Sequence, residues 1–232
     1  MRRSPILILL PCAILCTAAA QPPPPQESGW VSYRDAYRAM VTFVKYGKAK
    51  NYLQNHYQVA PKDAGQSLDG LRLTLSGRTT QLNLPLDATG RTTLPLLKAA
   101  YDENAVLVLN RKVSGFTFQP RLSIASRVDG VYEGLDLRSA CDQALQYLRY
   151  TETGYNSRHC TGVRFAFLKQ SDAAVRVRDP EREVALPPEE GAVFDGDVNT
   201  PFRVMVYRFA DWPERVQVIS QNAPVAIAPV IE

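Results

Sequence analysis

LRSACDQALQYLRY, residues 137–150, carries the clearest structural pattern in the chain. Apolar side chains recur there at the spacing i, i+4, i+7, i+8 and i+11, namely Leu137, Cys141, Ala144, Leu145 and Leu148. This spacing predicts a helix with one buried face, and Asp136 is placed to cap its first turn. Cys141 is therefore expected to lie on the buried face.

The next cysteine, Cys160, follows 19 residues later and opens an apolar strand, VRFAF at 163–167. Cys12 and Cys16 lie in an N-terminal leader, so Cys141 and Cys160 are the only cysteines expected in the mature chain. Two such cysteines in an oxidising compartment favour one disulfide. Closing a loop of this length stabilises a fold by ~3 kcal/mol. Two buried free thiols, or one reactive thiol, are the alternatives.

After Cys160 the chain shows only strand patterns. Apolar or alternating runs occur at 163–167, 175–178, 184–186, 202–207, 216–219 and 225–231. Prolines mark most of the boundaries between these runs. The sequence therefore predicts an all-β segment over 161–231.

The segment before this, 70–150, mixes strands and helices. Leu71, Leu73 and Leu75 alternate with polar residues, which is typical of a half-buried strand. A turn is expected at 87–90, and Pro95 suits the first turn of a short helix. Further strands are expected at 82–86, 106–109, 116–118 and 122–124.

A helical segment is expected over 32–57, before the first strand. Ser32 opens it, because Asp35 follows three residues later in a capping-box arrangement, and Gly47 ends the first helix. A second short helix is expected over 49–56. Together these patterns predict a β-rich α+β fold: an antiparallel sandwich or open barrel, with an N-terminal helical segment and a disulfide-tethered helix at 137–150.

Residues 1–20 have the composition of a secretory signal peptide. Arg2 and Arg3 precede an apolar run, and an A-x-A site at 18–20 predicts cleavage near Ala20–Gln21. A retained membrane anchor and a lipoprotein are the alternatives; the apolar run is short for a spanning helix, which needs roughly 20 residues. A Pro-rich spacer at 21–29 and a single exported domain at 30–232 are expected to follow, in the periplasm or outside the cell.

The charge balance argues against nucleic acid as a partner. The chain has 27 basic and 23 acidic residues, and loss of Arg2 and Arg3 leaves 25 basic residues and a net charge of +2. Such a balance creates no strong field toward nucleic acid or anionic lipid. No transmembrane segment is expected in the mature chain, and no nucleotide cofactor is expected because phosphate-cradling glycine motifs are absent from the sequence.

Catalytic motifs are also missing from the mature sequence. It contains neither G-x-S-x-G nor S-x-x-K, and its histidines are His56, expected in a buried helix stripe, and His159. A cysteine hydrolase using Cys160, or a zinc site with Cys141, His159 and Cys160, conflicts with the expected disulfide. A weak calcium candidate is the alternating set Asp195, Asp197 and Asn199, for which a polar turn is the simpler interpretation.

A cluster of tyrosine, arginine and asparagine at the end of the 137–150 helix is the candidate partner surface. It comprises Tyr147, Arg149, Tyr150, Tyr155, Asn156 and Arg158. These residue types combine rigid contact area with hydrogen bonding, although tyrosines at a core edge are the simpler explanation. The sequence favours a non-catalytic exported binding or envelope accessory module that recognises a protein, peptide or glycan. An exported hydrolase, using carboxylates or a metal without a sequence motif, is the alternative.

Overall fold

The computed structural model describes residues 29–198 and 202–232. The predicted signal peptide, its cleavage point, the spacer residues 21–28 and Asn199 lie outside these residues. Gly29, expected to end the spacer, is instead the first residue of strand β1 (Gly29–Ser32).

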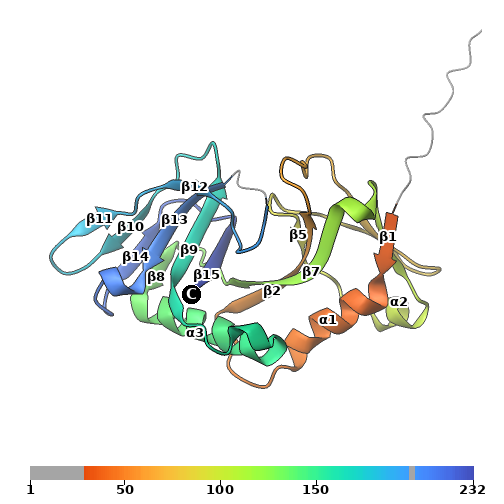
Figure 1. Ribbon diagram of the computed structural model, residues 1–232, viewed down its shortest axis with the longest axis horizontal. Helices are drawn as coiled ribbons and strands as arrows, with labels where there is room; N and C mark the ends of the chain where they lie inside the picture. Colours follow the sequence, from red (N-terminus) through yellow and green to blue (C-terminus); the bar gives the residue numbers. More distant parts are fainter. Residues whose placement is uncertain (1–28, 199–201) are drawn as a thin grey trace, which may run out of the picture.

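The described residues form a β-rich, sandwich-like α+β fold with three antiparallel sheets (Figure 1). The largest sheet has the order β12 (Glu189–Gly191), β13 (Phe202–Arg208), β9 (Cys160–Leu168), β15 (Ala226–Ile231), β7 (Phe116–Ile124), β2 (Leu53–Pro61) and β5 (Arg91–Thr92). The second has the order β1, β6 (Val106–Leu109), β3 (Leu73–Ser76) and β4 (Gln81–Leu84). The third has the order β11 (Glu183–Ala185), β10 (Val175–Arg178), β14 (Gln217–Ser220) and β8 (Val131–Glu133).

Three α-helices accompany these sheets in the described residues. They are α1 (Tyr33–Lys45), α2 (Lys98–Asp102) and α3 (Gly134–Thr151). Short 3₁₀ turns occur at η1 (Val113–Gly115), η2 (Thr153–Tyr155) and η3 (Phe209–Asp211). Within the described part of the chain, no helix is both long and apolar enough to cross a membrane.

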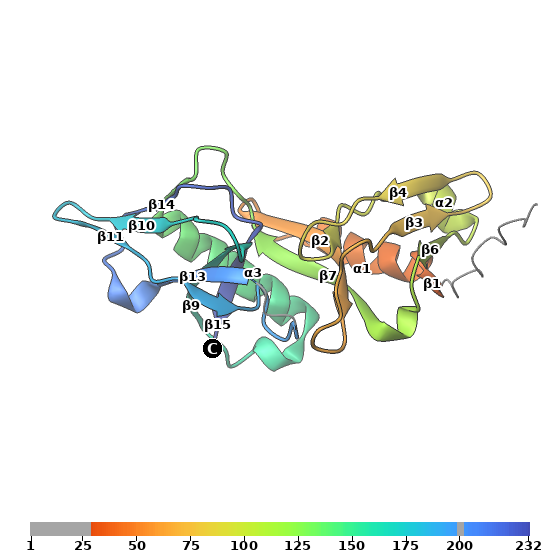
Figure 2. The same cartoon turned by 90° about the horizontal axis from the view of Figure 1, so that it is seen from above.

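Strands β2 and β7 join two hydrophobic cores. In both views they run through the middle of the molecule, between the part with α3 and the part with α1 and α2 (Figure 1 and Figure 2). Ile124 of β7 packs in the core under α3, whereas Phe116 of the same strand packs in the core beside α1. Likewise, Leu53 of β2 belongs to the first core and Val59 to the second. One continuous ribbon therefore contributes to both cores.

The predicted disulfide is present and tethers α3 to the start of β9. The Cα atoms of Cys141 and Cys160 are 6.0 Å apart, and Cys141 is fully buried. The predicted cap of α1 is also present, because the Ser32 Oγ accepts a hydrogen bond from the Asp35 backbone N–H at 3.4 Å.

The second helix predicted at 49–56 is wrong, because residues 53–61 form β2. The strand makes a nine-residue antiparallel pairing with β7, from Leu53 opposite Ile124 to Pro61 opposite Phe116. Asn, His, Tyr and Val are poor helix formers, so tertiary pairing outweighs the weak apolar periodicity. The strands expected at 116–118 and 122–124 are likewise one strand, β7, which continues through Pro120.

Asp136 does not cap α3. The helix begins earlier, at Gly134, and Glu133 at its N-cap position makes no side-chain capping bond. The Asp136 carboxylate instead accepts a hydrogen bond from the Tyr52 hydroxyl at 2.7 Å. Asp136 thus connects the first turn of α3 to the residue just before β2.

Candidate functional site

Polar side chains gather on one face of β2 and β7, and Gln58 among them is buried. In their antiparallel register His56 is opposite Arg121 and Gln58 is opposite Gln119, and on the other side of β2 Gln58 is opposite Arg91 of β5. Residues directly opposite one another point to the same face of a sheet. These five side chains therefore share one face, and the apolar residues Tyr57 and Val59 point to the other.

The segment 193–198, between β12 and β13, covers this face. Val193 and Phe194 are buried against the same sheet, in a cluster with Ala166 and Ala226. The Phe194 ring centre lies 4.9 Å from Arg121 Cζ and 5.4 Å from Arg91 Cζ. This places an aromatic ring within cation–π range of both guanidinium groups.

Beyond Phe194, Asp197 makes the central ion pair of the site. Its Oδ1 atom accepts a hydrogen bond from Arg121 Nη2 at 2.7 Å, and its Oδ2 atom accepts one from Gln58 Nε2 at 3.3 Å. Gln58 is held in turn, because its Oε1 atom accepts a bond from Arg121 Nε at 2.6 Å and its Nε2 atom donates to the Thr89 carbonyl at 3.0 Å. Gln58 and Arg121 are thus aimed at one carboxylate.

A second ion pair anchors Arg91, which is 6% exposed. Its Nη2 atom lies 2.9 Å from Asp87 Oδ2 and donates to the Val225 carbonyl at 2.6 Å, and its Nη1 atom donates to Ser123 Oγ at 3.2 Å. Asp87 Oδ1 also accepts bonds from the backbone and hydroxyl of Thr89, at 2.8 and 2.6 Å. The turn predicted at 87–90 therefore builds one wall of the site.

A third pair, between Arg164 Nη1 and Asp195 Oδ1 at 3.0 Å, lies closer to solvent. We refer to the three pairs together as the arginine–aspartate network: Arg91, Arg121, Arg164, Asp87, Asp195 and Asp197.

Burial makes the central pair costly. It raises the pKa of Asp197 even though Arg121 acts in the opposite direction, and it lowers the pKa of Arg121. Both shifts disfavour the charged forms, so the attraction between the two groups does not fully offset their loss of water. Burial, followed by the nearby Arg91, also lowers the pKa of His56.

Two cavities adjoin Asp197. The larger has a volume of about 870 Å³ and the smaller about 330 Å³, and Ala60, Pro61, Asp197 and Val198 line both. The larger cavity also exposes hydrogen-bonding groups from three connecting loops: Ser67, Asp69, Thr89, Lys169 and Gln170. Its volume lies within the range of small-ligand sites, roughly 300–1,000 Å³. Asp197 and Val198 thus lie on a wall that the two cavities share.

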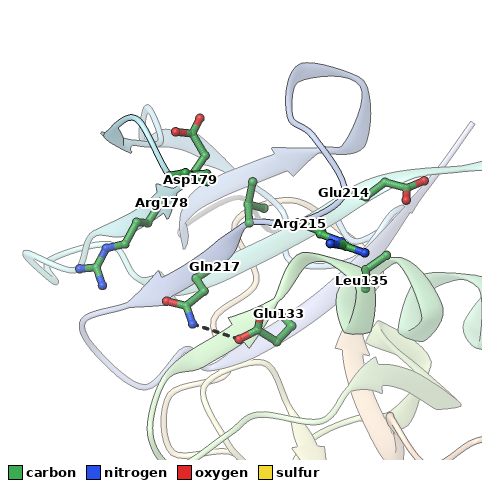
Figure 3. Close-up of a pocket in the computed structure, with 9 residues that line it drawn as sticks. Glu133, Leu135, Arg178, Asp179, Glu214, Arg215 and Gln217 are labelled. Carbon is green, nitrogen blue, oxygen red and sulfur yellow. Dashed lines mark hydrogen bonds between the residues drawn. The ribbon is translucent and has the colours of Figure 1, made fainter.

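A separate cavity, of about 400 Å³, lies where β8, β10 and β14 meet (Figure 3). Several of its polar and charged groups are already paired. Glu133 accepts a hydrogen bond from Gln217 at 3.1 Å, and Arg178 is paired with Glu183 at 2.7 Å. Figure 3 shows the Arg178 guanidinium directed away from Leu135 and Arg215. The polar groups of this cavity do not converge on one point, so the face beside Asp197 is the stronger candidate site.

Comparisons with known proteins identify no relative. The chain matches no family model, no curated protein and no solved structure. The site is therefore interpreted from its own residues.

The predicted partner surface divides into a buried and an exposed part. Tyr147 is 5% exposed and packs edge-on against Phe43 and Tyr46, and burial raises its pKa to about 12. Tyr150 is 63% exposed, and Arg149 donates to the carbonyls of Tyr155 and Arg158. Asn156 and Arg158 are also exposed. Tyr147 is thus a core residue, while the other five lie at the end of α3, in η2 and just after it, and stay a predicted contact surface.

The calcium candidates face cations of the protein. Asp195 pairs with Arg164 and Asp197 with Arg121, while Asn199 lies outside the described residues. Within residues 29–198 and 202–232, no three His, Cys, Asp or Glu side chains gather closely enough to hold a metal ion. Calcium binding at these residues stays a prediction.

The histidines are placed apart from the cavities. The sequence pattern predicts His56 on a helix, but it lies on strand β2. Its Nδ1 atom is buried without a hydrogen-bond partner. His159 is exposed just before β9. Neither histidine is among the residues that line the three cavities.

Sequence reasoning missed the arginine–aspartate network. The turn at 87–90 was predicted, but polar residues that alternate with apolar ones in a strand are ordinarily assigned to solvent. Nothing near Gln58 or Arg121 in the sequence indicates that the distant segment 193–198 covers them.

Proposed function

We propose that this chain is an exported, non-catalytic binding protein whose ligand is a peptide held in the cavity beside Asp197. The β-rich fold with its Cys141–Cys160 disulfide is compatible with an exported protein. Export itself depends on the signal peptide predicted at residues 1–20, which is part of this proposal. We also propose that residues 30–232 fold as one domain, supported by the shared position of β2 and β7 in two cores.

The observation that carries the proposal is the mixed lining of the 870 Å³ cavity. The lining includes the apolar residues Pro61, Leu68 and Phe202 together with Gln58 and Thr89, which carry hydrogen-bonding groups. A peptide presents both kinds of group, namely backbone amides and carbonyls between side chains of varied polarity. Such a surface binds by shape and hydrogen bonding and needs no reactive residue.

The proposal is tested by filling the cavity. Ala64 lines the cavity and is exposed, so Ala64→Trp is expected to occupy it without disturbing a core. Ala49→Trp is the matched control, because Ala49 is likewise an exposed alanine outside helices and strands but does not line the cavity. Protein purified from an exporting host is incubated with a proteolytic digest of envelope proteins, and the retained peptides are quantified by mass spectrometry.

We expect the native protein and the control variant Ala49→Trp to retain the same set of peptides, and Ala64→Trp to lose them. Retention of the same peptides by Ala64→Trp, or no retention by the native protein, would contradict the proposal. The intact mass of the exported protein tests localisation in the same preparation, because cleavage near Ala20 predicts a mature chain that starts at Gln21.

A further inference from the structure

The donors around Asp197 form a receptor for a carboxylate. Arg121 Nη2 donates to one carboxylate oxygen and Gln58 Nε2 to the other. Both donors are fixed by contacts independent of Asp197: Arg121 Nε donates to Gln58 Oε1, and Gln58 Nε2 donates to the Thr89 carbonyl. Gln58 is only 1% exposed, so its amide has little freedom to turn away. The receptor is therefore expected to keep its shape when Asp197 leaves.

The Asp197 side chain is also placed so that it can move away from Arg121 and Gln58 without unfolding the segment 193–198. Phe194 anchors the segment in the sheet, and Asp195 holds Arg164, both before Gly196. Gly196 has a φ of 85° and open space around it, so the chain direction changes there without close contacts. The Asp197 backbone N–H donates to the Phe194 carbonyl at 3.2 Å. A rotation of the Asp197 side chain, or of the chain beyond Gly196 with loss of that bond, therefore moves the carboxylate while Phe194 stays buried.

Outward movement of the Asp197 side chain would also open the receptor to both cavities, because Asp197 lines both, as do Ala60, Pro61 and Val198. Arg121 lines the smaller cavity and Gln58 the larger, so the receptor lies between them.

We propose that Asp197 occupies a receptor for the carboxylate of a peptide ligand, and that the ligand's carboxylate displaces it from Arg121 and Gln58. This inference rests on the proposed function, because it names the group by which a peptide in the cavity is recognised. The exchange conserves the charge pairing: Asp197 moves to water, and the incoming carboxylate neutralises Arg121. Bidentate and charge-assisted bonds of arginine are well matched to carboxylates.

The solvation that the Arg121–Asp197 ion pair loses on burial favours such an exchange. The Arg121 and Asp197 side chains are 18% and 14% exposed, and this burial raises the pKa of Asp197 and lowers that of Arg121. Asp197 recovers that solvation when it moves outward. The contacts that the ligand gains in the two cavities then determine its affinity.

The test removes the Asp197 carboxylate, which competes with a ligand for the donors of Arg121 and Gln58. Asp197→Ala is the main variant, and Asp195→Ala is its matched control, because Asp195 belongs to the same segment and also pairs with an arginine, Arg164. The probes are N-acetyl-trialanine with a free carboxylate, its C-terminal amide, and an amidated peptide of the same length with a central aspartate. The first and third probes distinguish a C-terminal carboxylate from a side-chain one. Affinities are measured by calorimetric titration of the exported protein.

We expect Asp197→Ala to bind the free-acid probe about tenfold more tightly than the native protein, which corresponds to about 1.4 kcal/mol. Asp195→Ala should match the native protein, and the amidated trialanine should show no gain. Adding Arg121→Gln to Asp197→Ala should abolish the gain. Circular dichroism confirms that each variant is folded, and if Asp197→Ala is not, Asp197→Asn keeps the side-chain volume and is expected to show a gain in the same direction.

Each of three results would overturn the inference: equal affinity of Asp197→Ala for the free-acid and amidated probes, the same gain in free-acid affinity in Asp195→Ala, or no gain in free-acid affinity in a folded Asp197 variant. These outcomes are separate from those of the cavity-filling experiment. If Ala64→Trp abolishes peptide retention while folded Asp197 variants show no preference for a carboxylate, the proposed function stands and the receptor does not.

Discussion

Arg121 and Asp197 are 76 residues apart in the sequence, yet their side chains meet at 2.7 Å with both largely buried. This contact, together with the buried Phe194, holds the segment 193–198 across the polar face of β2 and β7. It therefore encloses polar groups that an isolated β ribbon would leave in water.

Arg121→Ala is expected to lower the free energy of unfolding by about 1–3 kcal/mol, because it leaves the buried Gln58 Oε1 without its donor and deprives Asp197 of its cation, although the carboxylate can turn to water. The double variant Arg121→Ala/Asp197→Ala should recover part of that loss. Arg164→Ala is the control, and it should cost less than about 1 kcal/mol because Asp195 is 61% exposed. Urea unfolding measures all three. Equal losses for Arg121→Ala and Arg164→Ala would show that burial does not set the strength of the central pair.

Reduction of the Cys141–Cys160 disulfide is expected to lower the free energy of unfolding by ~3 kcal/mol, because the open chain gains entropy when unfolded. Urea unfolding with and without reductant gives the difference. A Cys141→Ser/Cys160→Ser variant should resemble the reduced protein and should not respond to reductant. A response of that variant would point to an effect other than this bond.

Acidification is expected to weaken the fold through His56. Its pKa is lower in the folded protein than its ordinary value of 6.5, owing first to burial and then to Arg91, with Asp87 acting in the opposite direction. A base with a depressed folded pKa contributes its full stability above the unfolded value and loses it as the pH falls toward the folded value. Urea midpoints at about pH 7.5 and about pH 5 should therefore differ less in His56→Gln than in the native protein. His159 is exposed, so His159→Gln should keep the native difference between the two midpoints. A smaller difference in that variant would assign the pH effect to His159 and not to His56.

Tyr147 and Tyr150 should respond differently to substitution although they lie one helical turn apart. Tyr147→Ala is expected to cost about 3–5 kcal/mol, as for other large aromatic side chains removed from a core. Tyr150→Ala should change stability by no more than about 0.5 kcal/mol, because Tyr150 is 63% exposed. Thermal unfolding distinguishes the two. A large loss in Tyr150→Ala would remove it from the predicted contact surface and place it in the core.

Gly90 is expected to be irreplaceable in the turn that positions Asp87. Its φ is 77°, and an added Cβ would lie 2.2 Å from the Val59 carbonyl oxygen. Gly90→Ala should therefore cost about 1 kcal/mol or more. Gly47→Ala, where an added Cβ meets no atom within 4 Å, should leave stability unchanged or raise it by about 0.4–1 kcal/mol. Chemical unfolding of both variants checks the contrast.

The local patterns of the sequence predicted the elements whose stability is local. The Ser32 cap, the buried face of α3 around Cys141 and the alternating leucines of β3 each carry their own signal. β2 was misassigned because residues 49–56 carry a weak apolar periodicity typical of a helix, whereas the pairing with β7 that makes 53–61 a strand has no signal in the local sequence.

The candidate site could not be predicted from local sequence patterns either, because it depends on contacts between distant segments. Gln58, Arg121 and Asp197 come from three distant segments; Gln58 and Arg121 do not stand out from their neighbours in the sequence, and Asp197 stood out only as a weak calcium candidate. Only the pairing of β2 with β7, and the covering of both by 193–198, brings them together.

The position of β15 constrains the order in which the sheet is completed. It is the last strand in chain order, yet it lies between β9 and β7 near the centre of the largest sheet. A chain that emerges N-terminus first, from a ribosome or a translocation pore, therefore leaves the facing edges of β7 and β9 unpaired until residues 226–231 arrive. The strand order itself keeps the sheet from closing before residues 226–231 arrive. The edges of β7 and β9 stay exposed during that interval, and a chaperone would be needed there.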